Sequence, residues 1–245
     1  MRVDALAIRL RPRANFEAAD LGVRLCQGSA RDVFTCYLAV YAPLVAIALA
    51  CYEIASWLPG LLLWWSKPWL DRTILFALSR AAFGQRTRPS DVWRGQRQVW
   101  WSQLLRTWTL QRLSLWRSFT QPIYQLEGLH GAELRSRVRQ IRVGRARAGT
   151  GILSAFSCAE SSILLGLTSL GFWLAPKGSG VGLQIFTQGT TGAGWSDLLL
   201  TLAYATAIGF VEPYFVAAGF ALYLSRRAEL EAWDIEQEFR RAFAG

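Results

Sequence analysis

The feature of this sequence that most constrains the fold is a run of about thirty mostly apolar residues, 195–224. At about 1.5 Å of rise per residue, a helix of this length exceeds the ~30 Å hydrocarbon layer of a bilayer. The run meets Arg226 and Arg227 and continues into a charged segment. A long apolar helix followed by paired arginines is typical of a membrane segment that ends on the cytoplasmic side.

Three other apolar runs, 33–57, 61–83 and 150–176, predict further crossings, so we expect an all-α integral membrane bundle of about four transmembrane helices. The chain is 52% hydrophobic, and these residues cluster in the runs, which favours a bundle over soluble domains. Lys67, Asp71 and Arg72 interrupt the run 61–83. That run is therefore expected either to cross the membrane with a polar centre or to form a re-entrant or interfacial helix.

The distribution of lysine and arginine predicts the orientation. Segment 177–194 carries one such residue, whereas 67–147 carries sixteen and the residues after 224 carry four. Cytoplasmic loops are enriched in these residues, so 177–194 is expected outside, and the middle block and the C-terminus inside. If the N-terminus is also inside, 61–83 must cross. The sequence thus predicts a multi-pass protein of the bacterial cytoplasmic (inner) membrane with both termini cytoplasmic.

Three segments are expected at the cytoplasmic surface: an amphipathic N-terminal segment 1–32, a basic interfacial segment 84–149, and an amphipathic tail 226–245. Tryptophan alternates with arginine over 98–119, which is typical of a helix in the headgroup layer. A basic helix follows, and we predict that its arginines contact anionic lipid headgroups, with a solvated basic helix as the alternative. These are Arg135, Arg137, Arg139, Arg142, Arg145 and Arg147. Nucleic acid is not a predicted partner, because the positive charge flanks apolar runs.

Small residues recur at spacings of three and four in two of the apolar runs, so they share one helical face in each. Such faces allow close helix packing in membranes, and we expect each to pack on another helix. They are Ala39, Ala42, Ala46 and Ala50, with Glu53 at the far end of the same seam, and Ser154, Ser157, Cys158 and Ser161. In a third run Ala205, Gly209, Val216 and Gly219 share a face with Glu212 at the same spacings, which predicts that this face lies in the packed interior.

Three acidic residues, Glu53, Glu160 and Glu212, lie inside apolar runs. A charge at mid-bilayer costs at least ~2.5–3.5 kcal/mol, so each should face the bundle and have a partner. Helical rise places Arg72, Glu160 and Glu212 at similar depth, and we predict that Arg72 pairs with Glu160, Glu212 or both. The predicted intramembrane polar cluster consists of Glu53, Lys67, Asp71, Arg72, Glu160 and Glu212, with Lys67 and Asp71 able to pair along their helix. It serves either packing and helix register, a polar path or substrate site, or acid catalysis in lipid chemistry.

Motifs for catalysis or metal binding are lacking in the sequence. The four cysteines form no CxxC pair, there is one histidine, and HExxH, GxSxG and a Gly-rich phosphate loop are missing. We therefore predict no enzyme, no catalytic residue, no metal site and no cofactor.

The segments VEPYFVAAGFALYLSRRAELEAWDIEQEFRR (211–241), WWSKPWLDRTILFALSRAAFG (64–84) and QLEGLHG (125–131) resemble an uncharacterised group of proteobacterial multi-pass inner-membrane proteins. More distantly, the alternation of crossings and interfacial helices is similar to the membrane domain of some glycerophosphodiester phosphodiesterases, without a catalytic motif. The resemblance implies proximity to genes for chaperone-like ATPases and envelope membrane proteins, and hence a subunit or assembly role. It transfers no functional residue.

The function predicted from sequence is non-catalytic: a membrane scaffold or accessory subunit that docks other membrane proteins at its cytoplasmic face. The docking surface would come from 100–119, 134–147 and the tail 229–239. The alternative is a small transporter or channel-like subunit that uses Arg72, Glu160 and Glu212. A wet cavity that reaches these residues would favour the transporter, and a dry, closed seam would favour the scaffold. A lipid-modifying enzyme ranks third.

Overall fold

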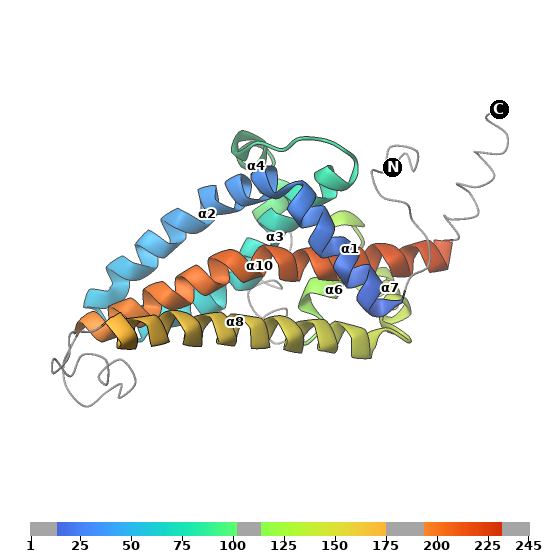
Figure 1. Ribbon diagram of the computed structural model, residues 1–245. Coiled ribbons are helices and arrows are strands. Elements are labelled where there is room, and N and C mark those ends of the chain that lie inside the picture. Colours follow the sequence, from blue (N-terminus) through green and yellow to red (C-terminus); the bar gives the residue numbers. More distant parts are fainter. Residues whose placement is uncertain (1–13, 102–113, 175–193, 232–245) are drawn as a thin grey trace.

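The structure, a computed structural model, describes residues 14–101, 114–174 and 194–231, and every regular element within these ranges is helical (Figure 1). The prediction of an all-helical fold is thereby confirmed for the described part of the chain. In chain order the elements are α1 (Asn15–Gly28), α2 (Ala30–Ala50), the short helix η2 (Cys51–Glu53), α3 (Leu58–Ala82), α4 (Pro89–Arg94), the π-turn η3 (Arg97–Trp101), α6 (Arg117–Leu126), α7 (Gly131–Arg142), α8 (Ala146–Leu174) and α10 (Gly194–Glu231).

Three stretches are long and apolar enough to cross a membrane: Ala30–Glu53, Ala146–Leu170 and Asp197–Glu231. These correspond to three of the four predicted crossings. The fourth, α3, is an uninterrupted helix of 25 residues that continues through Pro68 and packs beside α2. Its buried charges lower its apolar character, so length and composition alone do not mark it as a span.

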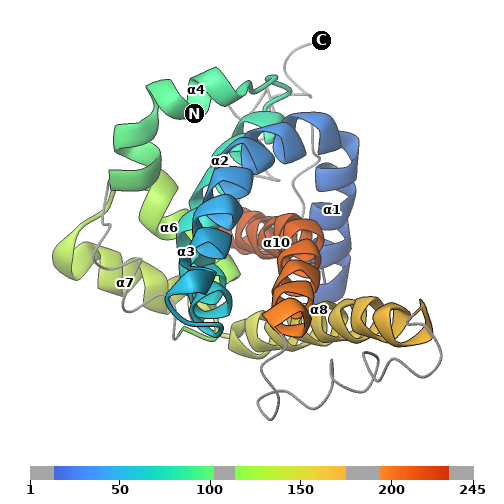
Figure 2. The same ribbon diagram turned by 90° about the vertical axis from the view of Figure 1, so that its left-hand side faces the viewer.

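Helix α10 is the centre of the bundle, because α1, α2, α3, α6, α7 and α8 all contact it. In the most apolar 18-residue stretch of α10, 83% of the residues are buried, whereas in the corresponding stretch of α8 only 6% are buried. Figure 2 shows α10 surrounded by the other helices, whereas α8 runs along the edge of the bundle. Much of α8 therefore faces the surroundings of the protein.

Two helices approach the backbone of α10 closely through glycines. A β-carbon on Gly22 of α1 would overlap the carbonyl group of Ala217, and one on Gly219 would overlap Ser118 of α6. Glycine allows such approaches because it has no side chain. Helix α1 lies within the amphipathic N-terminal segment 1–32 that the sequence predicts, and its Gly22 side packs on α10.

The short helix α6 inserts among α3, α8 and α10, although most of its side chains are polar. Ser118, Thr120, Gln121 and Gln125 are all buried. We expected 98–119 to lie in the headgroup layer and to dock partners, but Trp100 and Phe119 are interior residues. Residues 102–113 lie outside the described ranges, as do most of the loop 177–194 and the tail after Glu231.

The small-residue faces divide into two groups. On α10 the predicted face is buried or half-buried, as expected. On α2 and α8 the predicted faces do not pack against the described helices of this chain, because Ala42, Ala46 and Ala50 and all four residues of the α8 face are exposed. Helix α2 instead packs through larger side chains: the rings of Tyr37 and Tyr41 stack 5.0 Å apart, and the Tyr41 hydroxyl donates to the carbonyl of Ala205 at 2.6 Å.

Candidate functional site

Five charged side chains from four helices meet inside the bundle. They are Lys67 and Asp71 of α3, Arg117 of α6, Glu160 of α8 and Glu212 of α10. The side chains of all but Glu160 are at most 7% exposed, and Glu160 is 17% exposed. Burying charges of both signs is tolerated only when they are paired, so these residues fix how four helices sit against one another.

Lys67 and Arg117 each bind two carboxylates. The Nζ of Lys67 donates to both carboxylate oxygens of Glu160 at 2.6 Å and lies 3.4 Å from Glu212. The Nε of Arg117 lies 2.9 Å from Asp71, and its Nη2 donates to Glu212. Glu212 therefore joins the two cations, and Glu160 is held by Lys67.

Helix geometry explains why Lys67 and Asp71 reach the same site. Residues four apart lie on one face of a helix, so both side chains point from α3 toward α10 and α6. We expected these two to pair with each other along α3. In the structure each of them forms its ion pairs with residues of other helices, so they link α3 to three neighbouring helices.

Aromatic rings surround the two cations. The Nζ of Lys67 lies 5.6 Å from the ring centre of Tyr204, and the guanidinium of Arg117 lies 5.0 Å from that of Phe215. A cation over a ring face is stabilised by the ring quadrupole, by about 2 kcal/mol when it is desolvated.

Arg72 and Glu53 lie elsewhere than expected. Arg72 is buried, but its Nε donates to the carbonyl of Val99 rather than to Glu160 or Glu212. One step along a helix turns the side chain by about 100°, so Arg72 faces η3 whereas Asp71 faces the cluster. Glu53 is exposed in η2, because α2 ends at Ala50 and the predicted seam does not extend to it.

A cavity of about 370 Å³ lies beside the cluster. Four of the five charged residues line it; Asp71 does not. Its other walls are the aromatic side chains of Trp64, Phe156, Tyr204 and Phe215, the hydroxyls of Ser114, Ser157 and Ser161, and the aliphatic side chains of Leu115, Leu153 and Val211. This volume and this mixture of apolar walls with a few polar groups are those of a small-molecule site.

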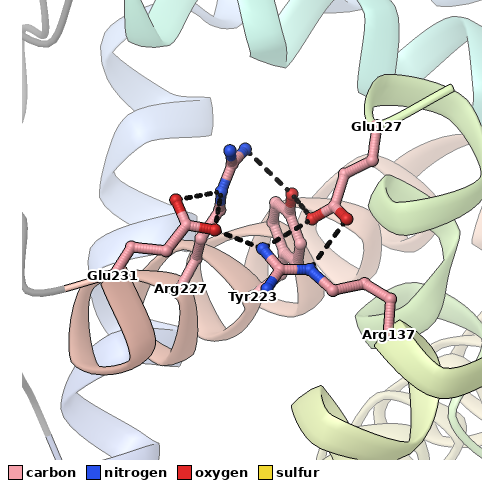
Figure 3. A network of polar contacts seen from close by, with 5 residues as sticks. All are labelled: Glu127, Arg137, Tyr223, Arg227 and Glu231. Carbon is pink, nitrogen blue, oxygen red and sulfur yellow. Dashed lines mark hydrogen bonds and ion pairs between the residues drawn. The ribbon is translucent and has the colours of Figure 1, made fainter. Parts of the chain in front are cut away.

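A second polar network lies near the C-terminal end of α10 (Figure 3). Arg137 of α7 pairs with Glu127 at 2.9 Å and with Glu231, and Glu231 also binds Arg227 at 2.9 Å. The Tyr223 hydroxyl donates to Glu127 at 2.7 Å. Burial lowers the pKa of the Arg137 guanidinium, but its hydrogen bonds to Glu127 and Glu231 more than offset this and raise the pKa above its ordinary value. The residues of this C-terminal network fasten α7 and the loop before it to α10.

The six arginines that we predicted as lipid contacts therefore have different surroundings. Arg137 belongs to the C-terminal network, and Arg145 binds Asn15 and Glu229. Arg142 lies 3.6 Å from the ring centre of Trp116. Arg135, Arg139 and Arg147 are exposed, and for these three lipid contact stays a prediction.

Arg117 is the member of the cluster that sequence reasoning missed. We assigned it to a headgroup-layer helix because tryptophan and arginine alternate before it. Two signals pointed the other way: three of the four residues after it, Ser118, Thr120 and Gln121, are polar, and Glu160, Glu212 and the Asp71 beside Arg72 need more than one cation. A short helix buried by insertion among longer ones leaves no long apolar pattern.

No protein-family model matches this chain, and no curated protein and no solved structure is significantly similar to it.

Proposed function

We propose that this chain is a small transporter-like membrane subunit whose binding site is the cavity beside the charge cluster. The observation that supports this is that the cavity reaches Lys67, Arg117, Glu160 and Glu212. A cluster that only fixes helix register would form a closed seam. An open space of this size next to paired charges instead offers a ligand both cations and carboxylates.

Glu160 is the residue best suited to exchange partners with a ligand. It is the most exposed carboxylate of the cluster, and the two hydrogen bonds that hold it both come from Lys67. A ligand that supplies a cationic group to Glu160, or an anionic group to Lys67, replaces this pair at little electrostatic cost. The side chains of Asp71 and Glu212 are at most 2% exposed and serve to position Arg117 and Lys67.

The proposed topology has α3 as a fourth crossing of a bacterial inner membrane, with both termini cytoplasmic. Helix α3 follows α2 after a short connection, and the two helices pack together over their lengths. If α2 crosses outward, α3 therefore has to return. The ion pairs of Lys67 and Asp71 remove the main obstacle, which is the cost of placing these charges in hydrocarbon.

The test compares Glu160→Gln with Glu53→Gln, a matched change at an exposed residue outside the site. Both variants replace the gene in the native host at equal protein abundance, and growth is profiled over a panel of envelope stresses beside a deletion strain. The proposal expects Glu160→Gln to reproduce the deletion profile and Glu53→Gln to match the wild type. A wild-type profile for Glu160→Gln would contradict a working role of the cavity.

A second candidate, the accessory subunit or scaffold, is favoured by the surface of α8. This helix exposes Leu165, Leu170 and Trp173 together with its row of small residues. Small residues on a membrane-facing helix allow another helix to approach closely. Purification in mild detergent distinguishes the two: a protein that co-elutes with the wild type and is lost in Cys158→Leu, but retained in Glu160→Gln, supports the scaffold.

A further inference from the structure

The mouth of the cavity indicates how a ligand enters, and this inference rests on the proposed function. The exposed lining residues are Trp64 of α3, Leu115 before α6, and Ser157 and Ser161 of α8. Ser157 and Ser161 lie near the middle of α8, which is one of the three helices suited to cross the membrane. In a membrane, the middle of a crossing helix faces hydrocarbon and not water. The mouth therefore opens sideways, into the lipid.

The edge of the mouth and its floor differ in polarity. At the edge, the half-exposed Trp64 and the exposed Leu115 suit contact with acyl chains. On the floor, Lys67 and Arg117 lie beside Glu160 and Glu212. A cavity with an apolar rim at mid-depth and a charged floor matches a molecule that carries a polar end on an apolar body.

The charges on the floor restrict the polar end further. Lys67 and Arg117 can bind a phosphate, and Glu160, which lines the same cavity as the ring of Tyr204, can bind an ammonium group. A purely anionic headgroup would add a negative charge to a floor where each cation already binds two carboxylates. A zwitterionic headgroup adds no net charge, which matters where unbalanced charge is costly. The volume of about 370 Å³ holds a headgroup and leaves acyl chains outside.

We propose that the cavity receives, through the lateral mouth between α3 and α8, the zwitterionic headgroup of a membrane phospholipid that carries a phosphate diester and a primary ammonium. Lys67 and Arg117 contact the phosphate, Glu160 contacts the ammonium, and the acyl chains remain in the bilayer. The binding step needs no chemical change of the lipid.

The test is photo-crosslinking of the whole protein in vesicles that contain phosphatidylethanolamine with a diazirine on one acyl chain. Labelled peptides are expected from α3 and from the middle of α8. Ser161→Trp fills the mouth and should lower the labelling of these peptides about tenfold, which corresponds to about 1.4 kcal/mol. Ala155→Trp places the same side chain at an exposed α8 position that does not line the cavity, and should leave labelling unchanged.

Competitors identify the headgroup and its source. Unlabelled phosphatidylethanolamine should suppress the labelling of the mouth, whereas phosphatidylglycerol and water-soluble glycerophosphoethanolamine should not. Equal competition by phosphatidylglycerol would show non-selective contact with surrounding lipid, and competition by the soluble headgroup would show entry from water; either result overturns the proposal. Labelling measures binding in a resting membrane, so it can succeed while the growth test of the transporter role fails, and the reverse.

Discussion

The buried charge cluster and the C-terminal network hold the same helix, α10, with the same kinds of side chain. In the cluster, Glu212 binds two cations and is 2% exposed. In the C-terminal network, Glu231 also binds two cations, but it is 25% exposed, and its partners Arg137 and Arg227 are 19–20% exposed. The chemistry is alike, and the difference is the access of water.

This difference sets what each network contributes. Partly hydrated ion pairs exchange water contacts for protein contacts at small net gain. Fully buried pairs gain little when intact, but a charge left without its partner has no water to replace it. The cluster therefore penalises every arrangement of the helices that separates its members, whereas the C-terminal network adjusts to change. We expect substitutions in the charge cluster to lower the unfolding free energy more than substitutions in the C-terminal network.

The largest effect is expected for Arg117→Leu. This change leaves Asp71, which is fully buried, without its cation, and should cost about 3–5 kcal/mol of unfolding free energy. Unfolding in mixed micelles with a rising fraction of SDS measures the loss. The double variant Arg117→Leu/Asp71→Leu should recover part of it, because an apolar pair leaves no orphaned charge. No recovery would show that Arg117 stabilises the fold through Glu212 alone.

A smaller effect is expected where α10 is held by packing without charge. Gly22→Ala places a β-carbon against the Ala217 carbonyl and should cost about 1–3 kcal/mol, chiefly by displacing α1. Gly28→Ala is the matched control, since a β-carbon there meets open space. Limited proteolysis between α1 and α2 reports the displacement. If both variants resist protease equally, α1 does not depend on this close approach.

In the C-terminal network, Arg137→Ala should cost only about 1 kcal/mol of unfolding free energy. Glu127 keeps its hydrogen bond from Tyr223, Glu231 keeps its ion pair with Arg227, and water can hydrate both carboxylates. The raised pKa of Arg137 keeps it charged at all ordinary pH values, so its contribution should be constant from neutral pH up to the ordinary arginine pKa and fall only above it. The same SDS titration at several pH values measures this. Arg135→Ala, on the exposed side of α7, is the control. If Arg137→Ala lowered the unfolding free energy as much as Arg117→Leu does, the two networks would not differ in their contribution to stability.

The last prediction concerns the orientation of the helices across the membrane, and no change of stability is expected. Cys51 follows α2 and is partly exposed, so a membrane-impermeant maleimide should label it in intact cells if that end is periplasmic. Cys26 is buried in α1, and burial raises the pKa of its thiol to about 12, so it stays protonated and unreactive at pH 7 to 8. Cys51→Ser should abolish labelling. Labelling of Cys51 only after cell lysis would reverse the proposed topology.

The sequence was informative about the long helices and less so about the short ones. Spacing and depth placed Glu160 and Glu212 near the charged centre of α3, because helical rise and period apply to any long helix. Arg117 could not be placed, because α6 is short and polar and is buried only through the shapes of its neighbours. The partners of Arg137 and Arg145 also lie far away in the sequence, so a basic helix looked like a lipid contact.

Pro213 stands inside α10, next to Glu212, and has no backbone N–H to donate to the preceding turn. The helix thus has a loosened joint one residue from the carboxylate that holds both cations, and about 27 Å from Glu231 at its far end. A small swing about this joint would draw Glu212 away from Lys67 and Arg117 and widen the floor of the cavity. In the proposed topology, the joint lies within the bilayer and the far end of the helix lies in the cytoplasm, so a partner bound there could act on the floor of the cavity.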